Sequence, residues 1–348
     1  MPNISIAGRR ISTSDAPYVV AELSANHNGR LDTALKLIEE AERAGADAVK
    51  LQTYRPDTIT LNSDAEEFQI HGGLWDGKTL YQLYEEAHMP WDWHAPLFEH
   101  ARKLGIAIFS TPFDNSAVDL LEDLNAPAYK IASFEAVDLP LIKYAASAGK
   151  PMIISTGMAD VDEIQEAVDA ARSGGCKELA ILHCVSGYPA PAADYNLRTI
   201  SDMIDRFGLV TGLSDHTLDN ATAIASIALG AAIIEKHFTL DRQGGGPDDS
   251  FSLEPADLAA LCRDCKTAWA ALGEVDYGRQ PSEQANVKFR RSLYFVKDLK
   301  AGDVITPNAV RSVRPGFGVA PKYWNEVIGK RVRRDIKANS RVEFELLQ

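Results

Sequence analysis

Residues 18–52 read YVVAELSANHNGRLDTALKLIEEAERAGADAVKLQ. The stretch begins and ends with a short apolar run, and the segment between the two runs is amphipathic. Four apolar residues of that segment recur at the spacing of one helix face: Leu31, Leu35, Ile38 and Ala41. Gly45 stands where such a helix would stop. The stretch therefore predicts a strand, a helix and a second strand.

The same unit recurs along most of the chain. Eight apolar runs can be recognised, at residues 18–23, 48–52, 106–111, 128–133, 152–156, 179–184, 209–214 and 232–237. The helical segments begin near Leu31, Trp93, Asn115, Asp138, Asp162, Leu197, Asn220 and Pro255. Strands that are apolar on both faces and separated by helices indicate a parallel sheet. Eight units within about 280 residues predict an α/β fold, a (β/α)8 TIM barrel. A doubly wound open sheet is the alternative, because a strand count does not prove closure. The first strand, however, lacks the GxGxxG turn that would favour it.

The pattern changes after Gly278. A polar stretch, GRQPSEQANVKF, leads into short alternating segments that are rich in turn residues and positive charge. We therefore predict a barrel domain over residues 1–280, a linker over 281–289 and a small β-rich domain over 290–348. Residues 53–92 form an insertion between the second strand and its helix. Its aromatic residues predict a packed lid rather than an open loop.

Composition limits the classes of partner. The net charge is −13 and the sequence pI is about 5.1, so nucleic acid and anionic membranes are disfavoured as partners. No apolar run approaches the ~20 residues that span a bilayer, and MPNISIAGRR has no signal-peptide core. We expect a cytoplasmic protein. Cys262 and Cys265 form a CxxC within a helical pattern. Without a second Cys or His pair nearby in the sequence, this motif only weakly indicates a zinc or redox site.

Polar residues stand at the ends of the predicted strands, where TIM barrels carry their active sites. Because side chains alternate along a strand, residues two apart share a face. This rule groups Glu22 with Ser24, Lys50 with Gln52, Ser214 with His216 and Glu235 with His237, and the other polar residues at or just beyond strand ends are Lys130, Ser133, Glu135 and Ser155. A charge within an apolar strand is costly unless it is paired, which makes Glu22 and Lys50 candidates for function. Asp215 has the opposite parity, and we expect it to orient its loop.

Two chemistries suit these residues. His216 and His237 end adjacent strands, so neutral imidazoles there could hold a divalent metal, although each could instead be a structural hydrogen-bonding group. The two lysines could bind a phosphate or carboxylate together with the serines. One lysine could instead form a Schiff base, as in lysine-dependent barrel aldolases. The residues alone leave these alternatives open.

A series of motifs resembles a known family. VVAELSANHNG, ADAVKLQTY, FSTPFD, YKIASFE, MIISTGM, LHCVSGYPAP, GLSDHT, IIEKHFTLD and GPDDSFSL occur in the same order as in the sialic acid (nonulosonic acid) synthase family. The C-terminal segment, with SVRPGFG, resembles the antifreeze-like (SAF) domain of those enzymes. The resemblance implies a condensation of phosphoenolpyruvate with the open-chain aldehyde of an N-acetylated amino sugar, which yields a nine-carbon 2-keto acid and phosphate.

The resemblance also implies roles for individual residues. It assigns phosphoenolpyruvate binding to Lys50, Lys130, Ser133, Ser155 and Ser214. His216 and His237 would hold a divalent metal, Mn²⁺ or Mg²⁺. Glu22 would act beside the reacting carbons, with Gln52 and Asp248 completing the catalytic site and Glu135 contributing to substrate binding. Arg314 would reach the N-acetyl group of the sugar from the SAF domain of the partner subunit in a domain-swapped homodimer.

The insertion narrows the choice of subfamily. Its pattern LWxGxxLYxLYxxA, followed by PWxWHxxLF, resembles pseudaminic acid synthases more than N-acetylneuraminate or legionaminate synthases. The implied sugar is 2,4-diacetamido-2,4,6-trideoxy-altrose, which is less polar than N-acetylmannosamine. Trp75, Trp91 and Trp93 near the site would suit such a sugar. The alternatives are the other two synthases, a lysine aldolase that leaves both histidines idle, and a non-catalytic sugar- or ice-binding protein.

Overall fold

The computed structural model describes residues 2–348, which form two compact units. The first unit ends at Gly273, and the second runs from Glu274 to Gln348. The division thus follows the last barrel helix directly, whereas the sequence pattern placed it after residue 280. The segment expected to be a linker contains a 3-10 helix, η5 (Pro281–Phe289), whose side chains are almost all exposed.

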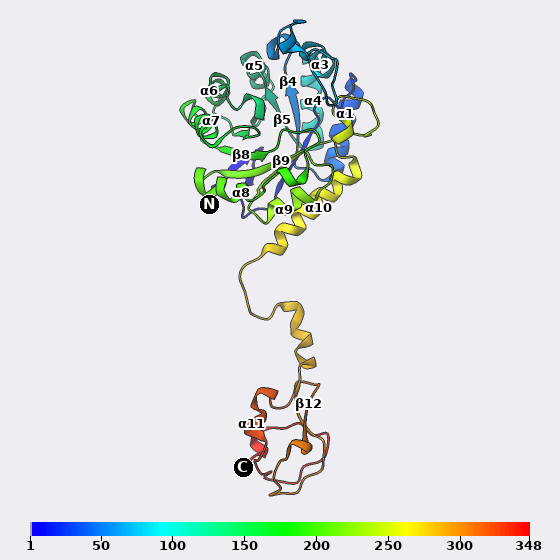
Figure 1. Ribbon diagram of the computed structural model, residues 1–348, viewed down its shortest axis with the longest axis vertical. Coiled ribbons are helices and arrows are strands. Elements are labelled where there is room, and N and C mark those ends of the chain that lie inside the picture. Colours follow the sequence, from blue (N-terminus) through cyan, green and yellow to red (C-terminus); the bar gives the residue numbers. More distant parts are fainter. Residues whose placement is uncertain (1) are drawn as a thin grey trace. The chain divides into compact units, whose positions relative to one another are not determined.

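The first unit is a closed barrel of eight parallel strands surrounded by helices, which confirms the predicted TIM barrel (Figure 1). The strands lie close to the predicted runs: β3 (Tyr18–Glu22), β4 (Ala48–Thr53), β5 (Ala107–Pro112), β6 (Tyr129–Ile131), β7 (Met152–Ser155), β8 (Leu179–Cys184), β9 (Val210–Asp215) and β10 (Ile233–His237). The barrel closes between its first and last strands, where Glu22 pairs with His237. On its other side, Glu22 pairs with Lys50.

The helices of the barrel begin and end at the signals visible in the sequence. They are α1 (Leu31–Ala44), α4 (Trp91–Leu104), α5 (Asn115–Asp123), α6 (Leu139–Ser147), α7 (Val161–Ser173), α8 (Thr199–Phe207), α9 (Ala221–Ile227) and α10 (Pro255–Leu272). Helix α1 ends at Gly45, whose φ of 87° requires the left-handed conformation that glycine adopts without strain. Helix α7 begins with a capping box between Asp160 and Glu163. No helix among residues 2–348 is both long and apolar enough to cross a membrane.

An N-terminal hairpin, which the sequence did not predict, packs against the interior of the barrel. Its strands β1 (Ile4–Ile6) and β2 (Arg9–Ile11) pair antiparallel. Ile4, Ile6 and Ile11 are buried in one cluster with Tyr18 and Val20, which lie at the start of β3. The hairpin thus covers the end of the barrel opposite to the carboxyl ends of the strands and leaves those ends available for a site.

The insertion after β4 is folded, as its aromatic residues predicted. It contains α2 (Pro56–Ile59), η1 (Glu66–Phe68) and α3 (Leu80–Ala87), which begins with a capping box at Thr79. The Trp75 indole donates a hydrogen bond to the Pro247 carbonyl over 3.1 Å, and the ring of Tyr84 meets that of Tyr54 edge-on. These contacts hold the insertion against loops at the carboxyl ends of the strands.

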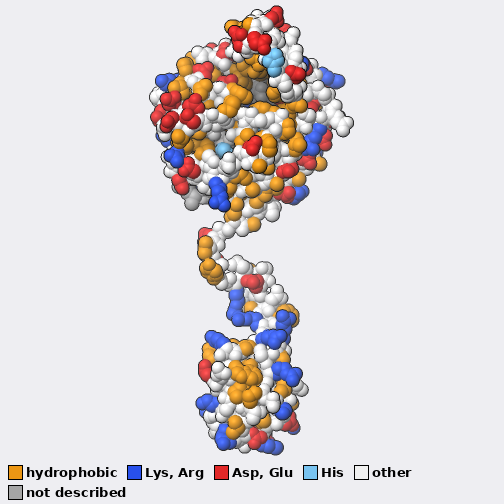
Figure 2. Space-filling model, in the orientation of Figure 1, with side chains coloured by type: hydrophobic (Ala, Val, Ile, Leu, Met, Phe, Trp, Pro, Cys, Tyr) orange, Lys and Arg blue, Asp and Glu red, His pale blue; other side chains and the backbone are white. Residues whose placement is uncertain are grey.

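The second unit has its own apolar core and little regular structure. Strands β11 (Ser292–Phe295) and β12 (Val310–Val313) pair antiparallel, isolated bridges extend the pairing, and the remaining elements are short: η6 (Pro307–Ala309), η7 (Pro321–Tyr323), α11 (Trp324–Val327) and η8 (Phe344–Leu346). Leu293, Phe295 and Val332 are among the buried residues of its core. On the face shown in Figure 2, the charged side chains of this unit are mainly Lys and Arg.

The CxxC motif lies within α10. Cys262 and Cys265 are buried and free, and burial raises the pKa of Cys262 to about 11. A thiol in this state is a poor nucleophile and a poor metal ligand. We therefore interpret both cysteines as part of the packing between α10 and the barrel.

Candidate functional site

The inward-facing side chains at the carboxyl ends of the barrel strands lie at one end of the barrel. The strands themselves contribute Glu22, Lys50, Gln52, Lys130, Ser155, Ser214, Glu235 and His237. Ser133 and Glu135 belong to η2 (Ser133–Glu135), the turn that follows β6, and His216 follows β9 directly. Asp248 precedes η4 (Asp249–Phe251) in the loop after β10. Eleven of the twelve predicted site residues therefore lie in the barrel unit, and Arg314 lies in the small one.

Two lysines and two carboxylates form a buried cluster at the centre of this site. Lys50 Nζ lies 2.6 Å from Glu22 Oε2, donates to Thr111 Oγ1 over 3.1 Å and lies 3.6 Å from Glu235 Oε1. Lys130 Nζ contacts both carboxylate oxygens of Glu235 at 2.8 Å. The four charged side chains are all at most 7% exposed. Buried charges of both signs satisfy one another here.

The charges of the cluster shift the pKa values of their neighbours. Burial alone would lower the pKa of Lys50, but Glu22 and Glu235 outweigh burial and raise that pKa above its usual value. Burial lowers the pKa of Lys130, and Glu235 offsets only part of this effect. The pKa of Glu235 is lowered although burial would raise it, because both ammonium groups lie beside it. Two buried amines close together suit a small, multiply charged anion.

A hydrogen-bonded chain links Glu22 to the loop after β10. The side-chain amide of Gln52 donates to Glu22 Oε1 and to Ser24 Oγ, each over 3.0 Å, and the Ser24 hydroxyl donates to Asp248 Oδ2. Burial raises the pKa of Asp248 to about 6 and that of Glu135 to about 7. Glu135 Oε2 is buried without a hydrogen-bond partner among the described residues. These two carboxyl groups therefore titrate close to neutral pH.

His216 and His237 face one another, with their ring centroids 5.4 Å apart. His216 Nδ1 lies 2.8 Å from the Val185 carbonyl, which fixes the tautomer and leaves Nε2 free to bind. His237 Nδ1 is buried without a hydrogen bond within residues 2–348 and lies 4.0 Å from Asp248 Oδ2. The ring of Tyr188 packs on both imidazoles, at 4.4 Å from His216 and 6.0 Å from His237.

These two imidazoles fit a divalent metal. Burial is the main cause that holds the pKa of His237 well below its usual value, so this ring is neutral and can donate a lone pair. Its unpartnered buried nitrogen is otherwise unexplained. The described part of the chain holds no group of three or more His, Cys, Asp or Glu side chains arranged for a metal. A metal held by the two histidines would thus keep several positions open for substrate or water.

A cavity of about 470 Å³ is lined in part by Gln52, whose side chain donates to Glu22 of the charged cluster. Its polar lining includes Ser24, Gln52, Glu135, His237 and Asp248. Much of the apolar lining comes from the insertion: Ile59, Ile70, Trp75, Leu80 and Leu83. Of the three tryptophans expected near the site, only Trp75 lines this cavity. Trp91 instead stacks on Arg55, with the guanidinium 3.8 Å from the ring centroid, and Trp93 packs edge-on against His27.

Sequence reasoning did not assign several residues of this site. Glu235 shares its parity with His237 and stands in an apolar strand, so the rule that selected Glu22 and Lys50 could also have selected it. Ser24 and Thr111 follow the same parity, but serine and threonine at a strand end are weak signals. Nothing in the sequence pattern pointed to Tyr188. Asp215 behaves as its parity predicted, because it faces outward, where Oδ2 pairs with Lys236 Nζ at 2.9 Å.

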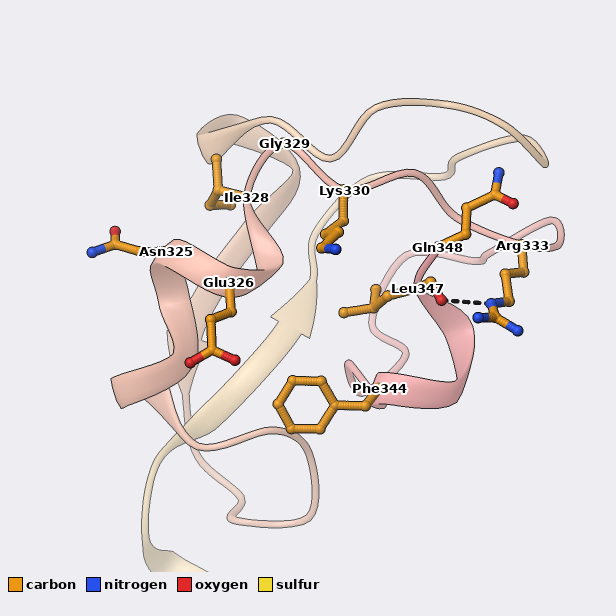
Figure 3. Close-up of a pocket in the computed structure, with 9 residues that line it drawn as sticks. All are labelled: Asn325, Glu326, Ile328, Gly329, Lys330, Arg333, Phe344, Leu347 and Gln348. Carbon is orange, nitrogen blue, oxygen red and sulfur yellow. Dashed lines mark hydrogen bonds between the residues drawn. The ribbon is translucent and has the colours of Figure 1, made fainter.

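The small unit contains Arg314 and a hollow of its own. Arg314 is exposed and precedes Pro315. A separate hollow of about 740 Å³ lies between α11 and the C-terminal residues (Figure 3). Arg333 donates there to the Leu347 carbonyl, and the other charged groups of the lining, Glu326 and Lys330, are exposed. Since it contains no buried charge, this hollow lacks the electrostatic character of the barrel site.

Comparisons with known proteins agree with this architecture. Residues 37–277 match the NeuB family, and residues 290–345 match the SAF domain. The chain is 43% identical to the pseudaminic acid synthase of Helicobacter pylori, over 93% of this chain and 96% of that protein. It is 38% identical to the N,N'-diacetyllegionaminic acid synthase of Campylobacter jejuni, over 92% of this chain and 96% of that protein.

A solved structure shows the same fold. The crystal structure of an N-acetylneuraminic acid (sialic acid) synthetase from Leptospira borgpetersenii matches with a TM-score of 0.73 and 31% identity, over 83% of this chain and 96% of that one. The chain thus contains a barrel, which carries the buried lysines and the two histidines, followed by the SAF unit. The motifs predicted the two parts in this order. The chain belongs to the NeuB family, the sialic acid (nonulosonic acid) synthase family, whose members are transferases.

Proposed function

We propose that this enzyme is a pseudaminic acid synthase. It would condense phosphoenolpyruvate with 2,4-diacetamido-2,4,6-trideoxy-altrose and release a nine-carbon 2-keto sugar acid and phosphate. The observation that carries the reaction is the buried pair of lysines beside Glu22 and the two histidines. The choice of sugar is supported by the pattern of the insertion and by the 43% identity to the pseudaminic acid synthase of Helicobacter pylori. We infer a cytoplasmic location.

Phosphoenolpyruvate would bind at the bottom of the site. Its phosphate and carboxylate carry the negative charge that Lys50 and Lys130 can balance, and Ser133, Ser155 and Ser214 can donate hydrogen bonds to the oxygens. The hydroxyl of Ser155 is buried without a hydrogen-bond partner in residues 2–348, which is expected of a group that waits for a ligand. Fixing both ends of the enol phosphate turns a random encounter into a positioned reaction.

The carbon–carbon bond forms when the enol phosphate attacks the aldehyde. This attack leaves cationic character at C2 of the enol phosphate. Glu22 is held in place for this step, because Lys50 contacts one of its carboxylate oxygens and Gln52 donates to the other. We propose that Glu22 stabilises the cation and orients the water that adds to it. The tetrahedral intermediate then expels phosphate, whose charge the two lysines accept.

The histidines would hold the metal. Mn²⁺ or Mg²⁺ bound by His216 and His237 would polarise the aldehyde oxygen as a Lewis acid. The contact of His216 with the Val185 carbonyl orients its ring for this purpose, and Tyr188 restricts both rings by packing against them. Asp248, within 4.0 Å of His237, lies where it can accept a hydrogen bond from the imidazole or from the substrate.

The sugar would occupy the cavity between the charged cluster and the insertion. The apolar wall suits the methyl group of a trideoxy sugar, and Glu135 offers a buried acceptor for an acetamido N–H. We further propose that Arg314 of a partner subunit completes the sugar site in a domain-swapped homodimer. The family resemblance supports that assignment, and an arginine suits the carbonyl oxygen of an N-acetyl group.

One assay tests the proposed function. Phosphate release is measured with phosphoenolpyruvate and each of three sugars: N-acetylmannosamine and the diacetamido-trideoxyhexoses of altro and manno configuration. We expect turnover with the altro sugar, with a nine-carbon acid identified by mass spectrometry. Turnover with only one of the other two would overturn the choice of sugar and leave the reaction intact.

A lysine-dependent aldolase is the second candidate, and the lowered pKa of Lys130 is the observation that favours it. If a Schiff base forms on Lys50 or Lys130, borohydride added during turnover would trap it as a covalent adduct. We expect no trapped adduct, because the enol phosphate already supplies the nucleophilic carbon. A covalent adduct on either lysine, with loss of activity, would replace the synthase mechanism with the aldolase mechanism.

A further inference from the structure

Ser24 occupies an unusual position in the site. It lies just after β3 and is 4% exposed, and its φ of 43° is in the left-handed region that residues other than glycine rarely adopt. Such a conformation costs free energy and persists where the surroundings enforce it. The hydroxyl group of Ser24 contacts two other site residues, Gln52 and Asp248.

The hydrogen bonds around Ser24 have a fixed direction. The carboxylate of Glu22 pairs with Lys50 through Oε2 and accepts a hydrogen bond from the NH₂ of the Gln52 side chain through Oε1. The second hydrogen of that NH₂ goes to Ser24 Oγ, which leaves the hydroxyl hydrogen for Asp248 Oδ2. Both hydrogens of the NH₂ are therefore used, and the carbonyl oxygen of the Gln52 side chain takes no part in these hydrogen bonds. Gln52 also lines the cavity, where a ligand could reach that oxygen.

We propose that Ser24 is a positioning residue that holds the Gln52 amide in one orientation, so that its carbonyl oxygen accepts a hydrogen bond from a hydroxyl or acetamido N–H of the sugar. The inference rests on the proposed function and adds a determinant of sugar recognition to it. Without Ser24, Glu22 alone would hold the amide, and the second N–H would lose its partner.

The test compares Ser24→Ala with Ser24→Gly. Both variants lose the hydroxyl, but only glycine relieves the backbone strain. We expect both to raise the KM for the sugar roughly three- to tenfold, the effect of one neutral hydrogen bond, while the KM for phosphoenolpyruvate changes less than about twofold. If Ser24→Gly kept the wild-type KM while Ser24→Ala did not, the backbone rather than the hydroxyl would be responsible, and the proposal would be wrong.

A double-mutant cycle with Gln52→Met asks whether Ser24 acts through Gln52. Methionine has a similar length but offers no hydrogen bond. We expect Ser24→Ala to change the sugar KM less than about twofold in the Gln52→Met background. An undiminished effect there, or an equal rise in the KM for phosphoenolpyruvate, would contradict the positioning role. No phosphate release by the wild type with any of the three sugars would instead contradict the proposed function, so the two failures are distinguishable.

Discussion

Replacing Glu235 by glutamine removes one negative charge from the buried cluster with almost no change in volume. In the wild type, the carboxylate of Glu235 contacts Lys130 Nζ at 2.8 Å through both oxygens and lies 3.6 Å from Lys50 Nζ. In the Glu235→Gln variant, Lys130 loses the one carboxylate contact that it makes at this range within residues 2–348. Lys50 retains Glu22, so the uncompensated charge falls on Lys130.

The size of the effect can be bounded in two ways. Removing one partner of a buried ion pair typically costs about 3–5 kcal/mol. Lys130 can also escape by losing its proton, and neutralising a lysine of ordinary pKa at pH 7 costs about 4.6 kcal/mol. We therefore expect the free energy of unfolding of the barrel to fall by about 3–5 kcal/mol in the Glu235→Gln variant. Since phosphoenolpyruvate would bring negative charge to both lysines, it should stabilise the variant more than the wild type.

Urea unfolding followed by far-UV circular dichroism, with and without phosphoenolpyruvate, measures both effects. Glu99→Gln is the matched control, because Glu99 forms an exposed pair with Lys103 on α4 and its loss should leave stability unchanged. A Glu235→Gln variant as stable as the control would show that Lys130 does not depend on Glu235. Equal stabilisation of variant and wild type by phosphoenolpyruvate would show that the lysines do not bind it.

Further predictions concern the other groups of the site. Glu22→Gln should keep phosphoenolpyruvate binding, measured by calorimetry, and lose most of kcat; near-normal turnover would remove its catalytic role. Burial raises the pKa of Glu135 to about 7, so the folded state favours the protonated form and loses stability as pH rises through 7. Glu135→Gln should therefore be more stable than wild type at pH 8, by at most about 3–4 kcal/mol, and similar to it near pH 4; a constant difference across this range would contradict the shift. Extensive chelation should abolish turnover, and added Mn²⁺ or Mg²⁺ should restore it. The His237→Ala variant should stay inactive when either metal is added. Full activity of the metal-free enzyme would exclude the proposed metal. Arg314→Ala should raise the KM for the sugar about tenfold without changing that for phosphoenolpyruvate; unchanged sugar kinetics would separate the SAF unit from substrate binding.

The sequence by itself determined the barrel and most of the candidate site. Periodicity is a local property, so the runs that became β3 to β10 and the helices between them could be read residue by residue. Parity along a strand is equally local. It placed Glu22, Lys50 and His237 on the inner face, and because the carboxyl ends of parallel strands meet at one end of a barrel, it also predicted that they lie together.

The partners of these residues were decided only by the tertiary structure. Lys130 and Glu235 are 105 residues apart in the chain, and Ser24 and Asp248 are 224 apart. Their contacts depend on barrel closure and on loop conformations that no local pattern encodes. For the same reason, parity could not show that Glu235 serves two lysines, that Trp75 lines the cavity while Trp91 and Trp93 do not, or that the N-terminal hairpin covers the far end of the barrel. Local spacing fixes which way a side chain faces, and only the packed fold fixes what it meets.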